Sequence, residues 1–319
     1  MRELWINRGF LPFVAVLVMN AMTDIAHKIT IQNLLIKSYE GDTLIILSAL
    51  VNALILIPFV LLFSPSGFIS DRFKKSHVVR YSAAAGVVLA LLATASYYLG
   101  WFYIAFALTF LLAAQSAIYS PAKYGLIKEI AGTERIAYAN GIVQAATIVA
   151  ILGSALLFSV LFESLYDGSD TPSQILKSVA PIGWMLVAMT LLELYFAFKI
   201  PQSSVNDAEK RFDAKEYFQL NYLRRNLSLI REDRSIWLSI IGLSMFWGIS
   251  QLVVAAFPAH YKSVTSDENT VVIQGILAAS AIGLMMGSFA AGRISRRRIE
   301  LGIVPLGALG MVLSLIYFS

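Results

Sequence analysis

The chain has 319 residues, of which 58% are hydrophobic and 14% are charged, and its formal net charge is +5. A soluble domain carries about 25% charged residues, so this composition excludes a soluble globular protein and predicts a membrane protein. Cysteine is absent, which excludes disulfides and thiolate metal sites. The three histidines, His27, His77 and His260, show no spacing typical of metal ligands.

Apolar runs predict nine membrane-spanning helices, because a helix needs roughly 20 mostly apolar residues to cross the ~30 Å hydrocarbon layer. In chain order the runs are Phe10–Leu35, Thr43–Phe63, Val78–Leu99, Phe102–Tyr119, Ala139–Phe162, Pro181–Ile200, Ile236–Pro258, Val271–Gly292 and Gly302–Phe318. The first run is too long for the apolar part of a signal peptide and lacks a small-residue cleavage site. We therefore interpret it as a spanning helix.

The distribution of lysine and arginine predicts the orientation of these helices, since cytoplasmic connections hold an excess of both. With the N-terminus inside, 21 of the 25 basic residues fall at the N-terminus or in inside connections. Only Lys37, Lys177 and Lys262 fall outside, and Lys28 lies within the first span. The sequence thus predicts a multi-pass protein with a cytoplasmic N-terminus. The basic charge reflects this topology and is weak evidence for nucleic acid binding.

One long polar segment, Gln202 to Arg234, separates the first six spans from the last three. We therefore predict a six-helix bundle at 1–201, a cytoplasmic linker at 202–235 and a partial C-terminal bundle at 236–319. Within the linker, apolar residues recur at helical spacing, at Leu220, Leu223, Leu227 and Ile230. This pattern fits a helix lying on the inner leaflet, or a solvated linker with some helix.

Two basic connections are similar to each other. GFISDRFKKSHVVR (67–80) follows the second span, and AAGRISRRRIELG (290–302) follows the eighth. Alignment of Asp71-Arg72-x-x-Lys75 with Gly292-Arg293-x-x-Arg296 gives a repeat that places each copy after the second helix of its half. Tandem repeats joined by a linker are typical of large transporter folds.

The first of these connections resembles the loop motif of the major facilitator superfamily, Gly-x-x-x-Asp-Arg-x-Gly-Arg-Lys. Gly67, Asp71, Arg72 and Lys75 match the motif, whereas Lys74 and Ser76 depart from it. The resemblance implies a gating role for these residues and for Arg293 and Arg296 in the second copy. We expect Gly67 to permit close approach of a neighbouring helix and Asp71 to face that helix's positive N-terminus.

Other stretches narrow the resemblance. YSPAKYG (119–125), ANGIVQAATIVAILGS (139–154) and SMFWG (244–248) resemble the bacterial lysophospholipid transporter branch of that superfamily. DIAHKITIQN (24–33) and LFSPSGFISDRF (62–73) resemble the form in which this transporter is fused to an acyltransferase and an acyl-carrier-protein ligase.

The resemblance implies an all-α membrane protein of the bacterial inner membrane with the major facilitator fold. A six-helix N-terminal half would be followed by the first three helices of the C-terminal half, so that the chain would be truncated relative to twelve helices. The implied partners are a lysophospholipid substrate, membrane lipids and an acyltransferase or acyl-carrier-protein ligase, separate or fused.

Polar residues on the first span predict a substrate path, because a charge inside a membrane helix costs about 2.5 to 3.5 kcal/mol on insertion scales and usually serves a function. Asn20, Asp24, His27 and Lys28 share one helix face. By resemblance, Asp24 corresponds to the family's acid on the substrate path. Alternatively, Asp24 and Lys28 form a neutralised i, i+4 pair that only docks this helix.

Three further spans carry candidate path residues. They are Gln115, Tyr119 and Lys123 on the fourth span, Asn140 and Gln144 on the fifth, and Gln251 on the seventh. We expect Pro121 to bend its helix and to turn Lys123 toward the cavity. Lys123 would otherwise be an ordinary loop lysine that contacts lipid headgroups. Glu193 is a further acid within a span, and the sequence assigns it no partner.

No nucleophile, metal or phosphate-loop signature is present in the sequence, so we expect neither an enzyme nor a cofactor. The favoured hypothesis is transport of lysophospholipids by alternating access, for reacylation inside the cell. Two alternatives stay open. The chain could be the membrane anchor or delivery module of a fused acyltransferase and ligase, or a proton-coupled transporter of another solute that uses Asp24 and Glu193 as proton carriers.

Overall fold

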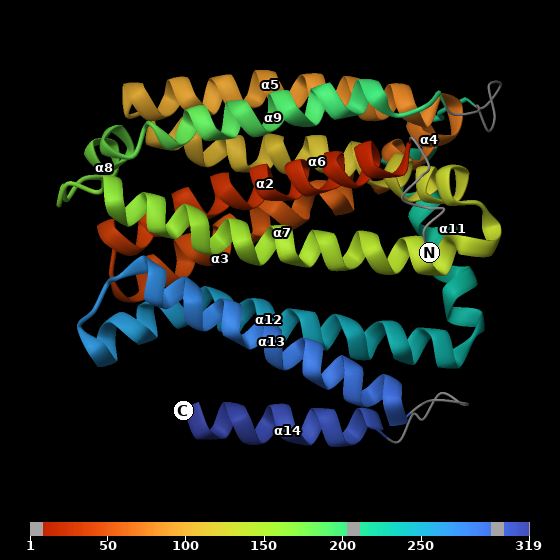
Figure 1. The fold of residues 1–319 in the computed structure, drawn as a ribbon. Coiled ribbons are helices and arrows are strands. Elements are labelled where there is room, and N and C mark those ends of the chain that lie inside the picture. Colours follow the sequence, from red (N-terminus) through yellow and green to blue (C-terminus); the bar gives the residue numbers. More distant parts are fainter. Residues whose placement is uncertain (1–8, 203–210, 295–302, 319) are drawn as a thin grey trace. The chain divides into compact units, whose positions relative to one another are not determined.

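A computed structural model describes residues 9–202, 211–294 and 303–318, and all regular structure within them is helical (Figure 1). The elements are α2 (Phe10–Ser38), α3 (Gly41–Leu61), α4 (Phe63–Arg72), α5 (Lys75–Leu99), α6 (Phe102–Ala131), the 3-10 helix η1 (Thr133–Arg135), α7 (Ile136–Leu165), α8 (Pro172–Ser178), α9 (Ile182–Lys199), α10 (Ala214–Phe218), α11 (Asn221–Glu232), α12 (Arg234–Thr265), α13 (Thr270–Ile294) and α14 (Ile303–Phe318).

The nine apolar runs correspond to α2, α3, α5, α6, α7, α9, α12, α13 and α14. Within the described residues, the first seven of these are long and apolar enough to cross a membrane. The other two contain shorter apolar stretches, Thr270–Ser280 and Pro305–Ser314. The predicted all-α membrane fold is confirmed.

Several boundaries differ from the prediction. The fourth span does not end at Tyr119, because α6 continues through Pro121 to Ala131. The motif predicted as a loop after the second span is largely the short helix α4. Likewise α12 continues through Pro258 to Thr265. A proline removes one backbone hydrogen bond from a helix but does not end it where neighbouring helices support the turn.

Contacts divide the chain into two compact units, Met1–Gln274 and Gly275–Ser319. In the first unit, α2 is the central helix, since it packs against α3, α6, α7, α8 and α9. Its buried side chains extend from Phe10 to Ile36 and contribute to two apolar clusters. The second unit consists of the rest of α13 together with α14. The predicted division at 202–235 stays a prediction.

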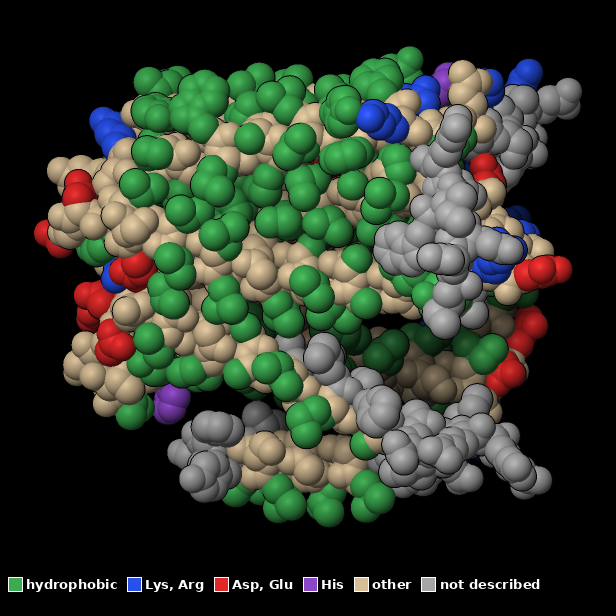
Figure 2. Space-filling model, in the orientation of Figure 1, with side chains coloured by type: hydrophobic (Ala, Val, Ile, Leu, Met, Phe, Trp, Pro, Cys, Tyr) green, Lys and Arg blue, Asp and Glu red, His purple; other side chains and the backbone are tan. Residues whose placement is uncertain are grey.

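The outer surface of the first unit is apolar along the middle of its helices. Large side chains such as Val88, Leu111 and Val149 are exposed there. Charged side chains gather instead at the helix ends (Figure 2). Such a surface fits lipid rather than water, because apolar side chains are favoured in hydrocarbon. The backbone polar groups are satisfied within the helices, as lipid requires. We call the end with α4 and α11 the basic end, and the opposite end the α8 end (Figure 1).

The linker contains helix, as its apolar spacing predicts. The helices in its described part are α10 and α11. At the start of α10, the Asp213 carboxylate accepts hydrogen bonds from the backbone N–H groups of Lys215 and Glu216. The Tyr217 hydroxyl donates to the Leu61 carbonyl at the end of α3. The position of α11 on a membrane surface stays a prediction.

Close packing of α5 on α9 depends on a glycine. A β carbon at Gly183 would lie 2.8 Å from the Thr94 α carbon, too close for a stable contact. We expect Gly183→Ala to destabilise the protein by about 1 to 3 kcal/mol through overpacking. Gly153→Ala is the matched control, because nothing lies within 4 Å of its added carbon. Thermal unfolding of the purified variants measures both effects, and equal midpoints for the two would contradict the prediction.

Candidate functional site

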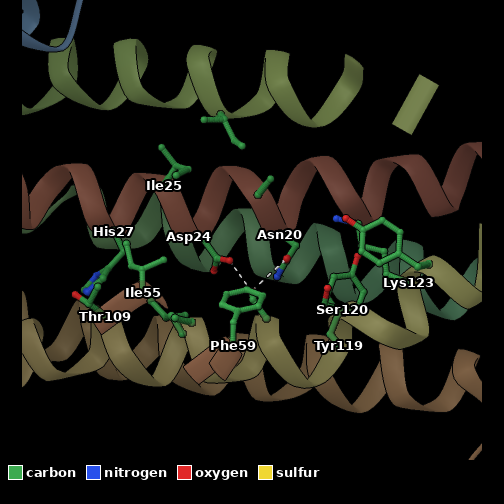
Figure 3. A pocket seen from close by; sticks show the side chains of 16 residues that line it. Asn20, Asp24, Ile25, His27, Ile55, Phe59, Thr109, Tyr119, Ser120 and Lys123 are labelled. Carbon is green, nitrogen blue, oxygen red and sulfur yellow. Dashed lines mark hydrogen bonds between the residues drawn. The ribbon is translucent and has the colours of Figure 1, made fainter. Parts of the chain in front are cut away.

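A pocket of about 300 Å³ lies between α2, α3, α6 and α7. Figure 3 shows how its side chains follow α2, with His27 and Thr109 at one end, Asp24 and Asn20 in the middle, and Ser120, Tyr119 and Lys123 at the other end. Phe59 and Ile55 of α3 supply apolar wall. The pocket is therefore a mixed surface in which polar groups from two helices face apolar groups from a third.

The Asp24 carboxylate is held by α6. Ser116 donates its hydroxyl hydrogen to Oδ2 of Asp24, and the buried Asn20 amide donates to Oε1 of Gln115 at 3.4 Å. Gln115 in turn donates to the Ser82 carbonyl on α5 at 3.0 Å. These bonds fix the carboxylate at the point where α2 faces α6.

Three buried oxygens that belong to lining residues have no hydrogen-bond partner among the described residues: Oδ1 of Asp24, Oγ1 of Thr109 and Oη of Tyr119. Most buried polar atoms in folded proteins are paired, and an unpaired one costs about 1 to 3 kcal/mol. Three such atoms around one pocket indicate a place that receives polar groups from a ligand or from water.

A positive charge lines the same pocket. Lys123 lies on α6, two residues beyond Pro121, and its ammonium is near enough to Asp24 for the two charges to interact. Lys123 thus lines a cavity in this structure, and its place on a substrate path stays a prediction. An acid and a base in one pocket can hold the two ends of a zwitterionic group, because each charge then meets its opposite.

His27 has a structural role in this arrangement. Its Nε2 donates to the Ala105 carbonyl at 3.0 Å, and its Nδ1 accepts from the Tyr97 hydroxyl at 2.7 Å. A carbonyl oxygen can only accept, so this geometry fixes the proton on Nε2. With both ring nitrogens paired, His27 joins α2 to α5 and α6 and offers no free nitrogen to a ligand.

The structure brings together some of the predicted path residues but not others. Asn20, Asp24, His27, Tyr119 and Lys123 line the pocket, and Gln115 lies directly behind them. The residues that do not line it are Lys28, Asn140, Gln144 and Gln251. Asn140 and Gln144 are exposed on α7, and Lys28 and Gln251 are half-buried. Their place on a substrate path stays a prediction.

The alternative role of Asp24, a neutralised pair with Lys28, is not found. No ion pair joins these two side chains in the described part of the chain, where the carboxylate is held by Ser116 instead. Asp24 and Lys28 face different neighbours from each other, although they are four positions apart on α2. Helical spacing alone therefore did not establish a contact.

Sequence reasoning missed Ser116, Ser120 and Thr109, which also line the pocket. Thr109 and Ser116 are seven positions apart, and Ser116 and Ser120 four, so all three share a face of α6 beside the face that carries Gln115, Tyr119 and Lys123. This second polar stripe could have indicated that Thr109, Ser116 and Ser120 line a pocket. It is a weak indication, because small hydroxyl residues are common in membrane helices.

The gating motif is partly described. Lys75 is buried, and its ammonium pairs with Glu129 of α6 at 2.6 Å. The Lys75 side chain lies over Gly125, which has no β carbon to block it. Nothing lies within 4 Å of the place where Gly67 would carry a β carbon, so the close approach expected there is absent among the described residues. Arg296 and the side chain of Arg293 lie outside the described part of the chain.

At the α8 end, polar contacts join α2 and α7 to the connection between α12 and α13. Glu163 of α7 pairs with Lys37 of α2 at 3.1 Å and accepts from the Thr270 backbone N–H at 2.6 Å. Lys262 donates to the Ile36 carbonyl at 2.7 Å. These contacts close the α8 end of this unit.

A buried amide reinforces that closure. Asn33 is fully buried and donates to the Ser159 hydroxyl at 3.1 Å, while its oxygen accepts from Gln274 at 3.2 Å. Asn33, Ser159 and Gln274 come from α2, α7 and α13. The pocket beside Asp24 is thus separated from the α8 end by a layer of paired polar groups.

Comparison with known families agrees with this architecture. A family description of the Major Facilitator Superfamily matches residues 9–319. The chain belongs to the major facilitator superfamily. This superfamily is a family of transporters and not of enzymes.

Individual relatives within the superfamily carry one name. The chain is 27% identical to the lysophospholipid transporter LplT of Photorhabdus laumondii, over 83% of this chain and 60% of the relative. It is 26% identical to LplT of Pectobacterium carotovorum, over 76% and 53% respectively, and 24% identical to LplT of Citrobacter koseri, over 99% and 73%. The chain thus spans about 60% of the length of the first of these relatives.

Proposed function

We propose that this superfamily member carries lysophospholipids across a bacterial inner membrane by alternating access, for reacylation inside the cell. The observation that supports the proposal is a pocket that combines the unpaired Oδ1 of Asp24, the Lys123 ammonium and the unpaired hydroxyls of Thr109 and Tyr119. The names of its relatives point to the same substrate class.

The pocket suits a phosphoethanolamine headgroup. The phosphate lies against Lys123 and the ammonium against Asp24, each forming a charge-assisted hydrogen bond. A volume of about 300 Å³ has room for the headgroup but is small for a long acyl chain. The chain therefore lies along apolar wall such as Ile55 and Phe59 and leaves between the helices.

Closure at the α8 end gives this pocket a direction. The Lys37–Glu163 pair and the Asn33 cluster separate it from the side that the charge rule predicts to face outside. Alternating access requires that these contacts break when substrate enters from that side and form again when it leaves inward.

Uptake of labelled lysophosphatidylethanolamine tests the proposal. Cells that lack their own lysophospholipid transporter receive this chain or a version extended to the length of its relatives, and conversion of the label to two-chain phospholipid is measured. We expect the extended version to restore uptake, with unlabelled lysolipid but not glycerophosphoethanolamine competing. An extended version that inserts at normal levels and moves no lysolipid would refute the proposal.

A second candidate, a proton-coupled transporter of another solute, is favoured by Glu193 of α9. This carboxyl is 1% exposed, its Oε1 has no hydrogen-bond partner in the part of the chain that the structure describes, and it lies against the Asn20 side chain behind the pocket. A buried acid of this kind inside a membrane helix is typical of proton relays.

The second candidate makes its own prediction in proteoliposomes. Under this candidate, a pH-sensitive dye inside the proteoliposomes reports proton entry when a transported solute is added outside, lysolipid gives no such signal, and Glu193→Gln removes the signal because the amide cannot carry a proton. Glu216→Gln, an exposed acid in the linker, is the control. An equal dye signal from the unmodified chain and from Glu193→Gln would exclude this candidate.

A further inference from the structure

A second, larger hollow lies on the outside of the first unit, away from the transport pocket. This groove has a volume of about 880 Å³ and is formed by α5 and α6 together with the end of α4. Its walls are mainly apolar, including Val78, Tyr81 and Leu89 of α5 and Leu111 and Ile118 of α6. Tyr81 is 76% exposed and Leu111 45%, so the groove opens to the surface that faces lipid.

The two ends of the groove differ in charge. Arg72, Lys74 and His77 line it at the basic end, and none of its described lining residues is acidic. The neighbouring Lys75 and Arg80 serve other contacts, since Lys75 pairs with Glu129 and Arg80 donates to the Ala197 and Ile200 carbonyls at the end of α9. At the mouth, Lys74 also donates to the Gln202 side chain at 3.4 Å, and the Arg72 guanidinium lies over the Phe68 and Phe73 rings.

The apolar part of the groove has the length of one lipid leaflet. Its α5 wall extends from Val78 to Leu89. At 1.5 Å per residue this is ~16 Å, and half of a ~30 Å hydrocarbon core is ~15 Å. A lipid whose headgroup lies at Lys74 therefore reaches the membrane midplane at Leu89, where the apolar lining ends.

We propose that this groove is a binding site for an anionic two-chain phospholipid of the inner leaflet, held by its phosphate at Arg72, Lys74 and His77 and by one acyl chain along α5 and α6. Charge complementarity favours an anionic headgroup, because the described lining residues at the mouth are basic and none of them is acidic. The lipid is a resident of the groove and differs from the transported substrate, so the inference does not depend on the proposed function.

The groove also touches the transport machinery. Its floor includes Gln115 and Ser82. Gln115 accepts from Asn20 and donates to the Ser82 carbonyl, so one side chain lies between the lipid groove and the residues that hold Asp24. A lipid in the groove therefore packs against the rear of the transport site.

Native mass spectrometry of the purified chain tests the proposal. Dioleoylphosphatidylglycerol and dioleoylphosphatidylcholine are titrated separately, and the bound fraction is read from the mass of the complex. We expect tighter binding of phosphatidylglycerol, weakened about fivefold by Lys74→Gln. Ala85→Trp, which places an indole in the groove, is expected to weaken it about tenfold.

Each variant has a matched control outside the groove. Lys128→Gln removes an exposed basic residue in the last turn of α6, and Ala107→Trp adds an indole at an exposed position of α6. Neither is expected to change binding. Equal weakening by Lys74→Gln and Lys128→Gln, or equal binding of the two lipids, would overturn the proposal. Lys74→Gln decides the question if Ala85→Trp fails to elute as a folded species.

Discussion

Asp24→Asn is expected to lower lysophosphatidylethanolamine uptake by the extended chain roughly 10- to 150-fold. The change keeps the size of the side chain and its acceptor for Ser116, but it removes the negative charge that the unpaired Oδ1 offers to a ligand ammonium. A hydrogen bond to a charged group contributes about 1.5 to 3 kcal/mol, which corresponds to that range. Initial uptake rates at equal protein levels measure the effect.

The headgroup dependence separates recognition from damage to the fold. A lysolipid without an ammonium, lysophosphatidylglycerol, is expected to lose much less uptake in the same variant. Asp42→Asn is the matched control, because Asp42 is exposed in the first turn of α3 and does not line the pocket. A similar loss for both lysolipids would assign Asp24 to the structure of the bundle and contradict its proposed role.

Glu163→Gln is expected to open the α8 end. The side chains of the Lys37–Glu163 pair are 7% and 22% exposed, and the same carboxylate accepts from the Thr270 backbone N–H. Breaking a fully buried pair costs about 3 to 5 kcal/mol. Since Glu163 is partly exposed, we expect about 1.5 to 3 kcal/mol, or roughly 10- to 150-fold in the population of the open form.

The absence of cysteine makes this effect measurable with one label. Ser159→Cys places a thiol in the fully buried cluster with Asn33. A membrane-impermeant maleimide added from outside is expected to modify it slowly in the parent chain and at least about tenfold faster with Glu163→Gln. Asp170→Asn, an exposed acid at the same end, should leave the rate unchanged. Equal rates in all three proteins would show that the ion pair does not hold this end closed.

The membrane fold could be predicted from sequence because its determinants are local. A long apolar run such as Thr43–Phe63 forms a helix in lipid whatever its neighbours, since lipid offers no other partner for its backbone. The ends of helices were less predictable. The segment from Tyr119 to Ala131 contains Pro121, Lys123 and Lys128, a pattern that predicts a connection between helices. In the structure it continues α6, because packing against α2 and α5 outweighs the hydrogen bond that Pro121 removes.

Half of the candidate site followed from spacing alone. Asp24 and Asn20 share a face of α2, and Tyr119 and Lys123 share a face of α6, and the structure places both pairs on one pocket. The same reasoning left open, as an alternative, a pair between Asp24 and Lys28, whereas in the structure Asp24 is held by Ser116. It also left His27 as a path residue, although Tyr97 and Ala105 occupy both of its nitrogens.

The sequence by itself determined that the chain is helical and crosses a membrane, which end of its helices is basic, and which family motifs it carries. These properties depend on composition, on periodicity along one helix and on charge in the connections. Only the tertiary structure decided which polar groups are paired. Whether Asp24 contacts Lys28 or Ser116, whether Glu163 meets Lys37 and whether a groove lies behind Gln115 depend on side chains from helices far apart in the chain. Their distances are set by packing rather than by any one segment.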